Sequence, residues 1–275
     1  MTALEAVHGV ARELDAVGVP SPRVDAEYLV AEVLGTSRTG LYSARRPLGE
    51  EQLLRLRSLV RRRSAREPLA YVLGEWGFRR LVLRVDRRAL VPRPETEAVV
   101  ERCLEHLRGI AEPRVLDIGV GSGAIALALA DEHPGARIVA VDDSEGALAL
   151  ARENLARLDG DGRIELRRGD LVRGVSGPFD LVVSNPPYVR PEEYESLQPE
   201  IRLWEPPGAV VGVGVGETIA REARAVLRPA GRLVLECGDG QAEALAAEFR
   251  ALGYEDVRAT PDLAGHDRVV EGTRP

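Results

Sequence analysis

Four consecutive residues, Asn185-Pro186-Pro187-Tyr188, form the most specific chemical pattern in this sequence of 275 residues. Each proline fixes its own φ angle and restricts the residue before it, so we expect the Asn185 amide and the Pro186 carbonyl to be held rigidly. Two fixed acceptors and an aromatic ring suit a planar NH2 group, because each acceptor can take one N–H bond while Tyr188 stacks on the plane. Such a nitrogen is a poor nucleophile because its lone pair is delocalised. If a sulfonium methyl donor lies in a neighbouring pocket, the two acceptors hold the nitrogen in line for displacement, and the catalytic gain is mainly proximity and orientation. The alternative is a proline-rich turn in which Tyr188 packs on the core.

A glycine-rich loop is the second candidate site, with the sequence Asp117-Ile118-Gly119-Val120-Gly121-Ser122-Gly123. It follows a strand-like segment and opens a helical one, so its glycines permit a tight turn and close approach of a ligand. The helix N-terminus offers free N–H groups to an anionic part of that ligand. With Ala124 the loop also fits the loose G-x-G-x-x-[GA] pattern of dinucleotide sites, so it does not name the cofactor by itself. A plain strand-to-helix turn is the bland alternative.

Two acidic residues follow the next two expected strands. Asp142 lies 23 residues after Gly119, where a carboxylate can accept both hydroxyls of an adenosine ribose. A helix N-cap is the competing role for Asp142, but Ser144 can supply that cap. Asp170 is placed to accept a hydrogen bond from an adenine amino group, although an Asx-turn explains it nearly as well. Ligands of open parallel sheets bind beyond the carboxyl ends of the strands, so we expect Asn185 to lie opposite the glycine loop.

The elements that position these residues alternate between strand and helix after residue 93. The patterns predict strands at 114–118, 137–141, 164–167, 180–184 and 232–236, and helices at 95–108, 124–130, 144–158, 217–227 and 241–252. This alternation favours an α/β fold with a mostly parallel sheet covered on both faces. We expect an all-helical domain at 1–76, a β-hairpin linker at 77–92 drawn from the alternating stretch 78–91, and the α/β domain at 93–275.

Composition narrows the chemistry available to the chain. All 37 basic residues are arginine, which excludes a P-loop lysine, a Schiff base and other amine-based mechanisms. Two cysteines and four scattered histidines offer neither a disulfide scaffold nor metal-ligand spacing, so we expect no metal site, buried thiols and a cytoplasmic location. The longest apolar stretch, 208–216, is far shorter than the roughly 20 residues of a membrane span, and the charged segment 1–17 does not look like a signal peptide.

Together the glycine loop, Asp142 and the Asn-Pro-Pro-Tyr motif resemble the S-adenosylmethionine-dependent amino-methyltransferases. Three further stretches narrow the resemblance to the HemK/PrmC family: Arg66-Glu67-Pro68-Leu69-Ala70-Tyr71-Val72-Leu73-Gly74, Leu90-Val91-Pro92-Arg93-Pro94-Glu95-Thr96-Glu97 and Asp262-Leu263-Ala264-Gly265-His266-Asp267-Arg268-Val269-Val270. That family methylates the side-chain amide nitrogen of the glutamine in the Gly-Gly-Gln motif of peptide chain release factors, and so supports translation termination. The resemblance implies a five-helix amino-terminal domain that docks the substrate, a hairpin linker and a Rossmann-like seven-stranded methyltransferase domain whose last strand is antiparallel.

The resemblance also implies roles for individual residues. It implies that the glutamine is held by Asn185, Pro186, Pro187 and Tyr188, with Asn185, Pro186 and Tyr188 as the catalytic residues. It implies that S-adenosyl-L-methionine is bound by Asp117, Gly119, Val120, Gly121, Ser122, Gly123, Asp142, Asp170, Leu171 and Asn185. The sequence departs from the family pattern at Val120, where a threonine is common, and in the segment Val211–Glu217, which is poorer in acidic residues than usual. Leu171 stands where the family often has an aromatic residue beside the adenine.

Three rival functions share parts of this pattern. A nucleic-acid amino-methyltransferase would act on the same kind of planar NH2 group, but it usually needs a basic surface, and residues 77–275 carry a net charge of -8. A catalytically silent binding module would not need the Asn-Pro-Pro-Tyr motif. A nicotinamide dehydrogenase would usually need a proton-transferring group such as a histidine, and no histidine lies near either motif.

These considerations set the expected partners. We expect release factors as protein substrates, no stable nucleic-acid complex, no membrane association and a monomer. The basic run from Arg55 to Arg66 falls on a predicted helix. A solvated helix face is favoured for this run over a surface that docks a partner.

Overall fold

The computed structural model describes residues 1–43, 47–158, 162–262 and 264–275, which divide into two compact units. The helical unit comprises Met1–Glu75 and Gln198–Trp204, and the sheet unit comprises Trp76–Leu197 and Glu205–Pro275. The segment 198–204 therefore belongs to the helical unit, although its neighbours on both sides in the chain belong to the sheet unit. Leu263, part of the family-like stretch 262–270, lies outside the described residues.

The helical unit gathers the predicted apolar stripes into one core. Its elements are α1 (Ala3–Ala16), α2 (Pro22–Leu34), the 3-10 helix η1 (Gly40–Ser43), α3 (Glu50–Ser64), α4 (Leu69–Leu73) and α9 (Pro199–Trp204). A capping box begins α1, because the Thr2 hydroxyl accepts from the Glu5 N–H and the Glu5 carboxylate accepts from the Thr2 N–H. Leu14, Leu29 and Leu41 are fully buried in the shared core. The expectation of a small all-helical bundle is thus confirmed.

The basic run 55–66 is divided between solvent and buried ion pairs. Arg63 on α3 is buried, donates from Nε to Asp25 at 2.7 Å and places Nη2 2.8 Å from Glu200 on α9. Arg66 donates to both oxygens of the same Glu200 carboxylate, at 2.8 and 2.7 Å. A solvated face is therefore wrong for Arg63 and Arg66, because their acidic partners come from distant parts of the chain that helical spacing cannot reveal.

A seven-stranded sheet organises the other unit. Its strands are β3 (Arg114–Ile118), β4 (Arg137–Asp142), β5 (Ile164–Arg168), β6 (Phe179–Ser184), β7 (Leu227–Glu236), β8 (Glu255–Pro261) and β9 (Asp267–Thr273), in the order β5-β4-β3-β6-β7-β9-β8. The first five pair in parallel, whereas β9 runs antiparallel to both β7 and β8. This order confirms the predicted seven-stranded, mostly parallel sheet with an antiparallel last strand.

The chain reverses its direction of travel across the sheet between β3 and β6. Ile118 pairs with Ser184 on one side and with Val141 on the other, so Gly119, Asp142 and Asn185 each follow directly after paired residues. Neighbouring strands lie about 4.8 Å apart. The register alone therefore brings the glycine loop, Asp142 and the proline loop (Asn185–Tyr188) to one edge, at the switch point where open α/β sheets bind ligands.

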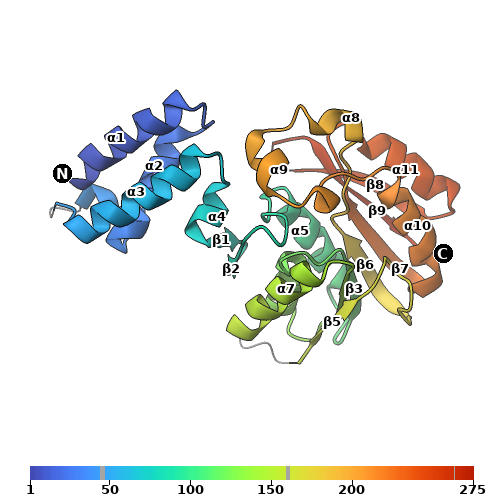
Figure 1. Ribbon diagram of the computed structural model, residues 1–275. Coiled ribbons are helices and arrows are strands. Elements are labelled where there is room, and N and C mark those ends of the chain that lie inside the picture. The colour runs from blue at the N-terminus through green and yellow to red at the C-terminus, as the bar shows by residue number, and fades with distance from the viewer. Residues whose placement is uncertain (44–46, 159–161, 263) are drawn as a thin grey trace. The chain divides into compact units, whose positions relative to one another are not determined.

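Helices cover both faces of this sheet. In Figure 1, α5 (Thr96–Leu107) and α7 (Glu145–Arg157) lie on one side, while α10 (Val215–Val226) and α11 (Ala242–Ala251) lie together on the other. The helix α6 (Ala124–Glu132) packs against α5 and β4. Two short elements, α8 (Pro191–Tyr194) and the 3-10 helix η2 (Pro207–Ala209), follow the proline loop. No helix in the described part of the chain is long and apolar enough to cross a membrane.

The β-hairpin lies earlier in the chain than the stretch 78–91 that we expected to form it. Its strands are β1 (Glu75–Phe78) and β2 (Leu81–Arg84). The turn is at Arg79, which adopts a φ of 50°, donates its backbone N–H to Glu97 at 3.1 Å and pairs its guanidinium with Glu132. These contacts to α5 and α6 fix the turn, and alternation of apolar residues along the chain does not reveal them.

A second ion-pair cluster ties α5 to the sheet. The Glu271 carboxylate on β9 is buried and accepts from Arg102 at 2.8 and 2.7 Å, while His106 Nε2 lies 3.3 Å away. Burial by itself would raise the pKa of Glu271, but the adjacent His106 ring and the hydrogen bonds from Arg102 outweigh it and lower that pKa to about 2. The two thiols of the chain, Cys103 and Cys237, are free and buried as expected.

Candidate active site

A cavity of about 560 Å³ opens at the carboxyl ends of β3, β4 and β6 in the sheet unit. The predicted site residues that line it are Gly119, Val120, Gly121, Ser122, Asp142, Asp170, Leu171, Asn185, Pro186 and Pro187. Three predicted residues, Asp117, Gly123 and Tyr188, do not line it. The structure thus brings the two loops and both expected acidic residues to one hollow.

The glycine loop leaves open space on its cavity side. Gly119 and Gly121 adopt φ angles of 75° and 55°, which L side chains rarely adopt. No atom would lie within 4 Å of a Cβ on Gly119, and the nearest atoms to one on Gly121 lie 4.0 Å away. A Cβ on Gly123 would instead approach Leu127 Cδ1 to 2.9 Å. The first two glycines therefore make room for a ligand, whereas Gly123 makes room for α6.

Asp142 is held by backbone donors that fix its carboxylate at the cavity. Its Oδ2 accepts from the Gly121 N–H and its Oδ1 from the Ser144 N–H, both at 2.9 Å. Ser144 supplies the N-cap of α7, because its Oγ accepts from the Ala147 N–H at 3.2 Å. Burial raises the pKa of Asp142, and the two backbone N–H groups oppose that rise. Each oxygen keeps acceptor capacity for one hydroxyl of a ligand.

Asp117 lies beneath the loop rather than in the cavity. It is fully buried, and its Oδ2 accepts from the Ala126 N–H at 3.1 Å. Its Oδ1 is buried with no hydrogen-bond partner in the described residues. Burial, opposed by the Ala126 N–H, raises the pKa of Asp117 to about 7. In this structure Asp117 fixes the first turn of α6 behind the glycine loop.

Asn185 is connected to two buried residues that the sequence reasoning missed. Its Nδ2 donates to Thr96 Oγ1 at 3.1 Å, and Thr96 Oγ1 donates to Glu236 Oε2 at 2.7 Å. Thr96 lines the cavity, and both Thr96 and Glu236 are buried. Sequence signals did exist, since Thr96 lies in the family-like stretch 90–97 and Glu236 is a lone carboxylate at the end of an apolar strand. The NH2 group of the Asn185 amide therefore faces Thr96, and its Oδ1 is left as the acceptor.

The rest of the proline loop is braced from one side by the segment 210–212. The Val189 N–H donates to Val210 O and the Gly212 N–H donates to Val189 O, both at 3.0 Å. A Cβ on Gly212 would lie only 2.6 Å from Pro187 O. The beginning of the divergent segment 211–217 thus packs directly against the proline loop, and this contact requires glycine.

Tyr188 is packed on the other side of the loop. Gln241 Nε2 donates to Tyr188 O at 3.0 Å, and a Cβ on Gly238 would lie 3.0 Å from Tyr188 Cδ2. Burial, reinforced by the charge of Glu236, raises the pKa of the Tyr188 phenol well above its ordinary value. The ring is half-buried in this setting.

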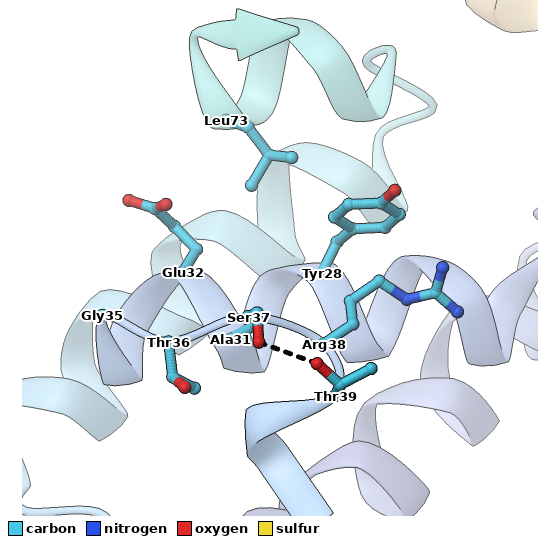
Figure 2. A pocket seen from close by; sticks show the side chains of 9 residues that line it. All are labelled: Tyr28, Ala31, Glu32, Gly35, Thr36, Ser37, Arg38, Thr39 and Leu73. Atoms are coloured by element: carbon cyan, nitrogen blue, oxygen red, sulfur yellow. Dashed lines mark hydrogen bonds between the residues drawn. The ribbon is translucent and has the colours of Figure 1, made fainter. Parts of the chain in front are cut away.

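A second hollow, of about 620 Å³, lies in the helical unit. Figure 2 shows Tyr28, Glu32, Arg38 and Leu73 around it. The Arg38 guanidinium lies 4.9 Å from the centre of the Tyr28 ring, and Glu32 pairs with Arg55 on α3. Its charged groups are thus engaged in contacts within the unit. Among the described residues, no group of three or more His, Cys, Asp or Glu side chains could hold a metal ion.

Comparison with known proteins places the chain in a family. Residues 5–74 match the PrmC N-terminal domain and residues 98–201 match the methyltransferase small domain. A release factor glutamine methyltransferase of Caulobacter vibrioides is 39% identical over 280 aligned residues, covering 100% of this chain and 97% of the relative. The corresponding protein of Deinococcus radiodurans is 43% identical over 268 residues, covering 95% of this chain and 94% of the relative.

Solved structures agree on the fold. The 16S rRNA N2 G1207 methyltransferase of T. thermophilus, in complex with AdoMet and guanosine, has a TM-score of 0.53 at 20% identity, covering 73% of this chain and 50% of that chain. At this level of identity the likeness shows the fold alone. On the evidence of relatives that match almost its whole length, this chain belongs to the release factor glutamine methyltransferase family.

Proposed function

We propose that this protein transfers a methyl group from S-adenosylmethionine to the side-chain amide nitrogen of the glutamine in the Gly-Gly-Gln motif of peptide chain release factors. The observation that carries the proposal is the orientation of the Asn185 side-chain amide. Its NH2 group is engaged by Thr96, so its Oδ1 is the atom left to accept an N–H at the cavity. Relatives named for this activity match the chain along its length, and they supply the identity of the substrate.

The cavity fits S-adenosylmethionine, whose sulfonium methyl is the electrophile supplied when it is bound. Gly119 and Gly121 leave open space beside the backbone, and Asp142 keeps acceptor capacity on both carboxylate oxygens for the ribose hydroxyls. Asp170 is exposed, and its Oδ2 accepts from Arg173 at 2.7 Å, which leaves Oδ1 for an adenine amino group. Leu171 is half-buried at the cavity wall and offers an apolar surface to the ring.

The proline loop provides the acceptor side of the reaction. The Oδ1 of Asn185 and the carbonyl of Pro186 would each accept one N–H of the substrate amide and so orient its nitrogen toward the donor. Pro186 and Pro187 restrict the backbone that carries both acceptors. The amide nitrogen would bond to the methyl carbon as the carbon–sulfur bond of the sulfonium breaks, the donor would leave as a neutral thioether, and one amide proton would pass to solvent. In this scheme alignment of the nitrogen, rather than its prior deprotonation by a base, lowers the barrier.

Transfer of labelled methyl tests this function directly. Three acceptors would be compared: a purified release factor, the same factor with its Gly-Gly-Gln glutamine replaced, and a mixture of DNA and RNA. We expect label on the intact factor alone. Label on nucleic acid alone would keep the amino-methyltransferase chemistry and refute the substrate, while no label on any acceptor, with donor binding confirmed, would refute catalysis.

Asn185→Ala tests the catalytic assignment within the same assay. The substitution removes the side-chain acceptor without changing the two prolines that fix the backbone. We expect methyl transfer to be lost while S-adenosylmethionine still binds. Glu192→Ala, on the exposed helix α8, is the control and should behave as the unmodified protein. Unchanged turnover in Asn185→Ala would contradict the assignment.

The same proposal extends to partners and location. We propose that the helical unit docks the release factor, that the enzyme acts as a cytoplasmic monomer, and that it forms no stable complex with nucleic acid. The net charge of -8 on residues 77–275 supports the last point, because stable binding to phosphate backbones requires basic surface. Light scattering of the protein alone and with a release factor would measure both the oligomeric state and the complex.

A further inference from the structure

Asn185 is the outer end of a hydrogen-bonded chain that runs from the cavity into the core. Thr96 at the start of α5 accepts from Asn185 Nδ2 at 3.1 Å and donates to Glu236 Oε2 at 2.7 Å, at the end of β7. Thr96 and Glu236 are 4% and 1% exposed, so bulk water does not compete for these bonds. Three elements far apart in the sequence thus converge on one side-chain amide.

The chain of bonds has a direction that Glu236 imposes. Burial raises the pKa of Glu236 to about 7, and the hydrogen bonds with Thr96 and Asn185 oppose that rise. In its deprotonated form Glu236 has acceptors only, so the single hydroxyl proton of Thr96 points to it, as the hydrogen bond at 2.7 Å requires. The lone pairs of Thr96 Oγ1 then face Asn185, and only the NH2 end of that amide can complement them. A flipped amide would place two oxygen acceptors against each other with no proton between them. The structure accordingly has Nδ2, and not Oδ1, at Thr96.

We infer that Thr96 and Glu236 are positioning residues that fix the amide orientation of Asn185 and so make it an acceptor of the substrate N–H. This inference rests on the proposed function of the cavity. With the amide reversed, the NH2 group of Asn185 would face the NH2 group of the methyl acceptor, two donors would oppose each other, and the nitrogen would lose its alignment. Asp142, at the donor side of the cavity, makes its hydrogen bonds with Gly121 and Ser144, outside this hydrogen-bonded chain.

In the described part of the chain, the Thr96 hydroxyl has its hydrogen bonds with Asn185 and Glu236. Thr96 is the first residue of α5, and the residue before it, Glu95, makes no side-chain cap to the helix. The single hydroxyl proton of Thr96 is donated to Glu236. Burying a carboxylate costs free energy, and apolar residues of similar size at the end of β7 would usually pack at least as well. The placement of Glu236 beside the acceptor loop is therefore explained by what it does to Asn185.

Turnover of matched variants tests the inference. Thr96→Val keeps the shape of the side chain and removes its hydroxyl, whereas Thr96→Ser keeps the hydroxyl. Glu236→Gln keeps the shape of the side chain but replaces one carboxylate oxygen, an acceptor, with an NH2 group, a donor. We expect Thr96→Val to lower kcat for a release factor on the order of 30-fold, because small misalignments carry costs of this size. Glu236→Gln should lower kcat about tenfold, and Thr96→Ser should stay within about threefold of the unmodified protein.

Two further measurements distinguish an effect on the orientation of Asn185 from an effect on the stability of the fold. The Kd for S-adenosylmethionine and the melting temperature should change little in these variants. Thr218→Val is the control, because its hydroxyl donates to Gly214 O at 2.8 Å within α10 and has no contact with the chain of bonds to Asn185. It should leave kcat unchanged. If Thr96→Val does not fold, the kcat of Glu236→Gln is compared with that of Thr96→Ser instead.

The outcomes separate this inference from the proposed function. If the unmodified protein methylates the release factor and Thr96→Val keeps its kcat within twofold, the positioning role is overturned and the function stands. If Thr96→Val lowers kcat, the affinity for S-adenosylmethionine and the melting temperature together, the role of Thr96 is purely structural and the positioning role is also overturned. Failure of the unmodified protein to methylate any release factor would overturn the function, and this inference with it.

Discussion

Binding of S-adenosylmethionine should depend on the charge of Asp142, and Asp142→Asn isolates that charge. Both carboxylate oxygens already accept one backbone N–H, from Gly121 and Ser144, at 2.9 Å each. An asparagine has one acceptor oxygen in place of two, so its NH2 group must face one of these two N–H donors. The side chain then either turns away or leaves a donor unpaired, and in both cases a ribose hydroxyl loses its partner.

The size of the effect follows from the bonds removed. A hydrogen bond to a charged group contributes about 1.5–3 kcal/mol, and the substitution removes at least one such bond and weakens the second. We therefore expect a loss of about 2.8 kcal/mol, which is roughly a 100-fold increase in Kd. The turnover of bound complex should change much less, because the proline loop, which we propose aligns the substrate, is untouched.

Isothermal titration with S-adenosylmethionine measures this Kd directly. Glu145→Gln is the matched control, because it removes one carboxylate charge three residues away on a side chain outside the cavity lining. The control should keep the Kd of the unmodified protein within about twofold. A Kd for Asp142→Asn that also stays within threefold would refute the role of Asp142 in holding the donor.

Three further substitutions should change activity or stability in ways that follow from the structure. Gly212→Ala places a Cβ 2.6 Å from Pro187 O, so it should shift the proline loop and lower kcat about tenfold or more with donor Kd unchanged; full activity would refute the bracing contact. Arg63→Leu leaves the buried Glu200 without one of its cations, so the free energy of unfolding of the helical unit should fall by about 3 kcal/mol in urea titrations followed by circular dichroism. The pKa of Glu271 is lowered from 4.5 to about 2, so its stabilisation is full above pH 4.5 and is lost as the pH falls toward 2. Glu271→Gln should therefore flatten the loss of stability across that window, measured by urea unfolding at several pH values, and an unchanged slope would contradict the ion pair's role.

The sequence patterns predicted the five parallel strands of the sheet unit because the signals of those strands are local, whereas β8 and β9 were expected only from the family resemblance. Each core strand is a short apolar run that ends at a glycine, an aspartate or a proline motif, and parallel pairing then brings those ends to one edge. The positions of Gly119, Asp142 and Asn185 follow from this rule together with the register of β3 with its neighbours. The hairpin was misplaced because its turn at Arg79 depends on contacts with α5 and α6.

The two sides of the candidate site differ in the same way: one is specified by residues close together in the sequence, and the other by residues far apart. Its donor side is built from backbone: the glycine loop and the two N–H groups that hold Asp142 all lie between residues 117 and 144, so a short motif suffices to specify them. Its acceptor side depends on side chains 89 and 140 positions apart, from Asn185 to Thr96 and from Thr96 to Glu236. No spacing rule connects such residues before the sheet has formed. Substitutions at Thr96 or Glu236 should therefore change how the methyl acceptor is aligned and leave donor binding intact, and that separation of effects is what the kcat and Kd measurements together can detect.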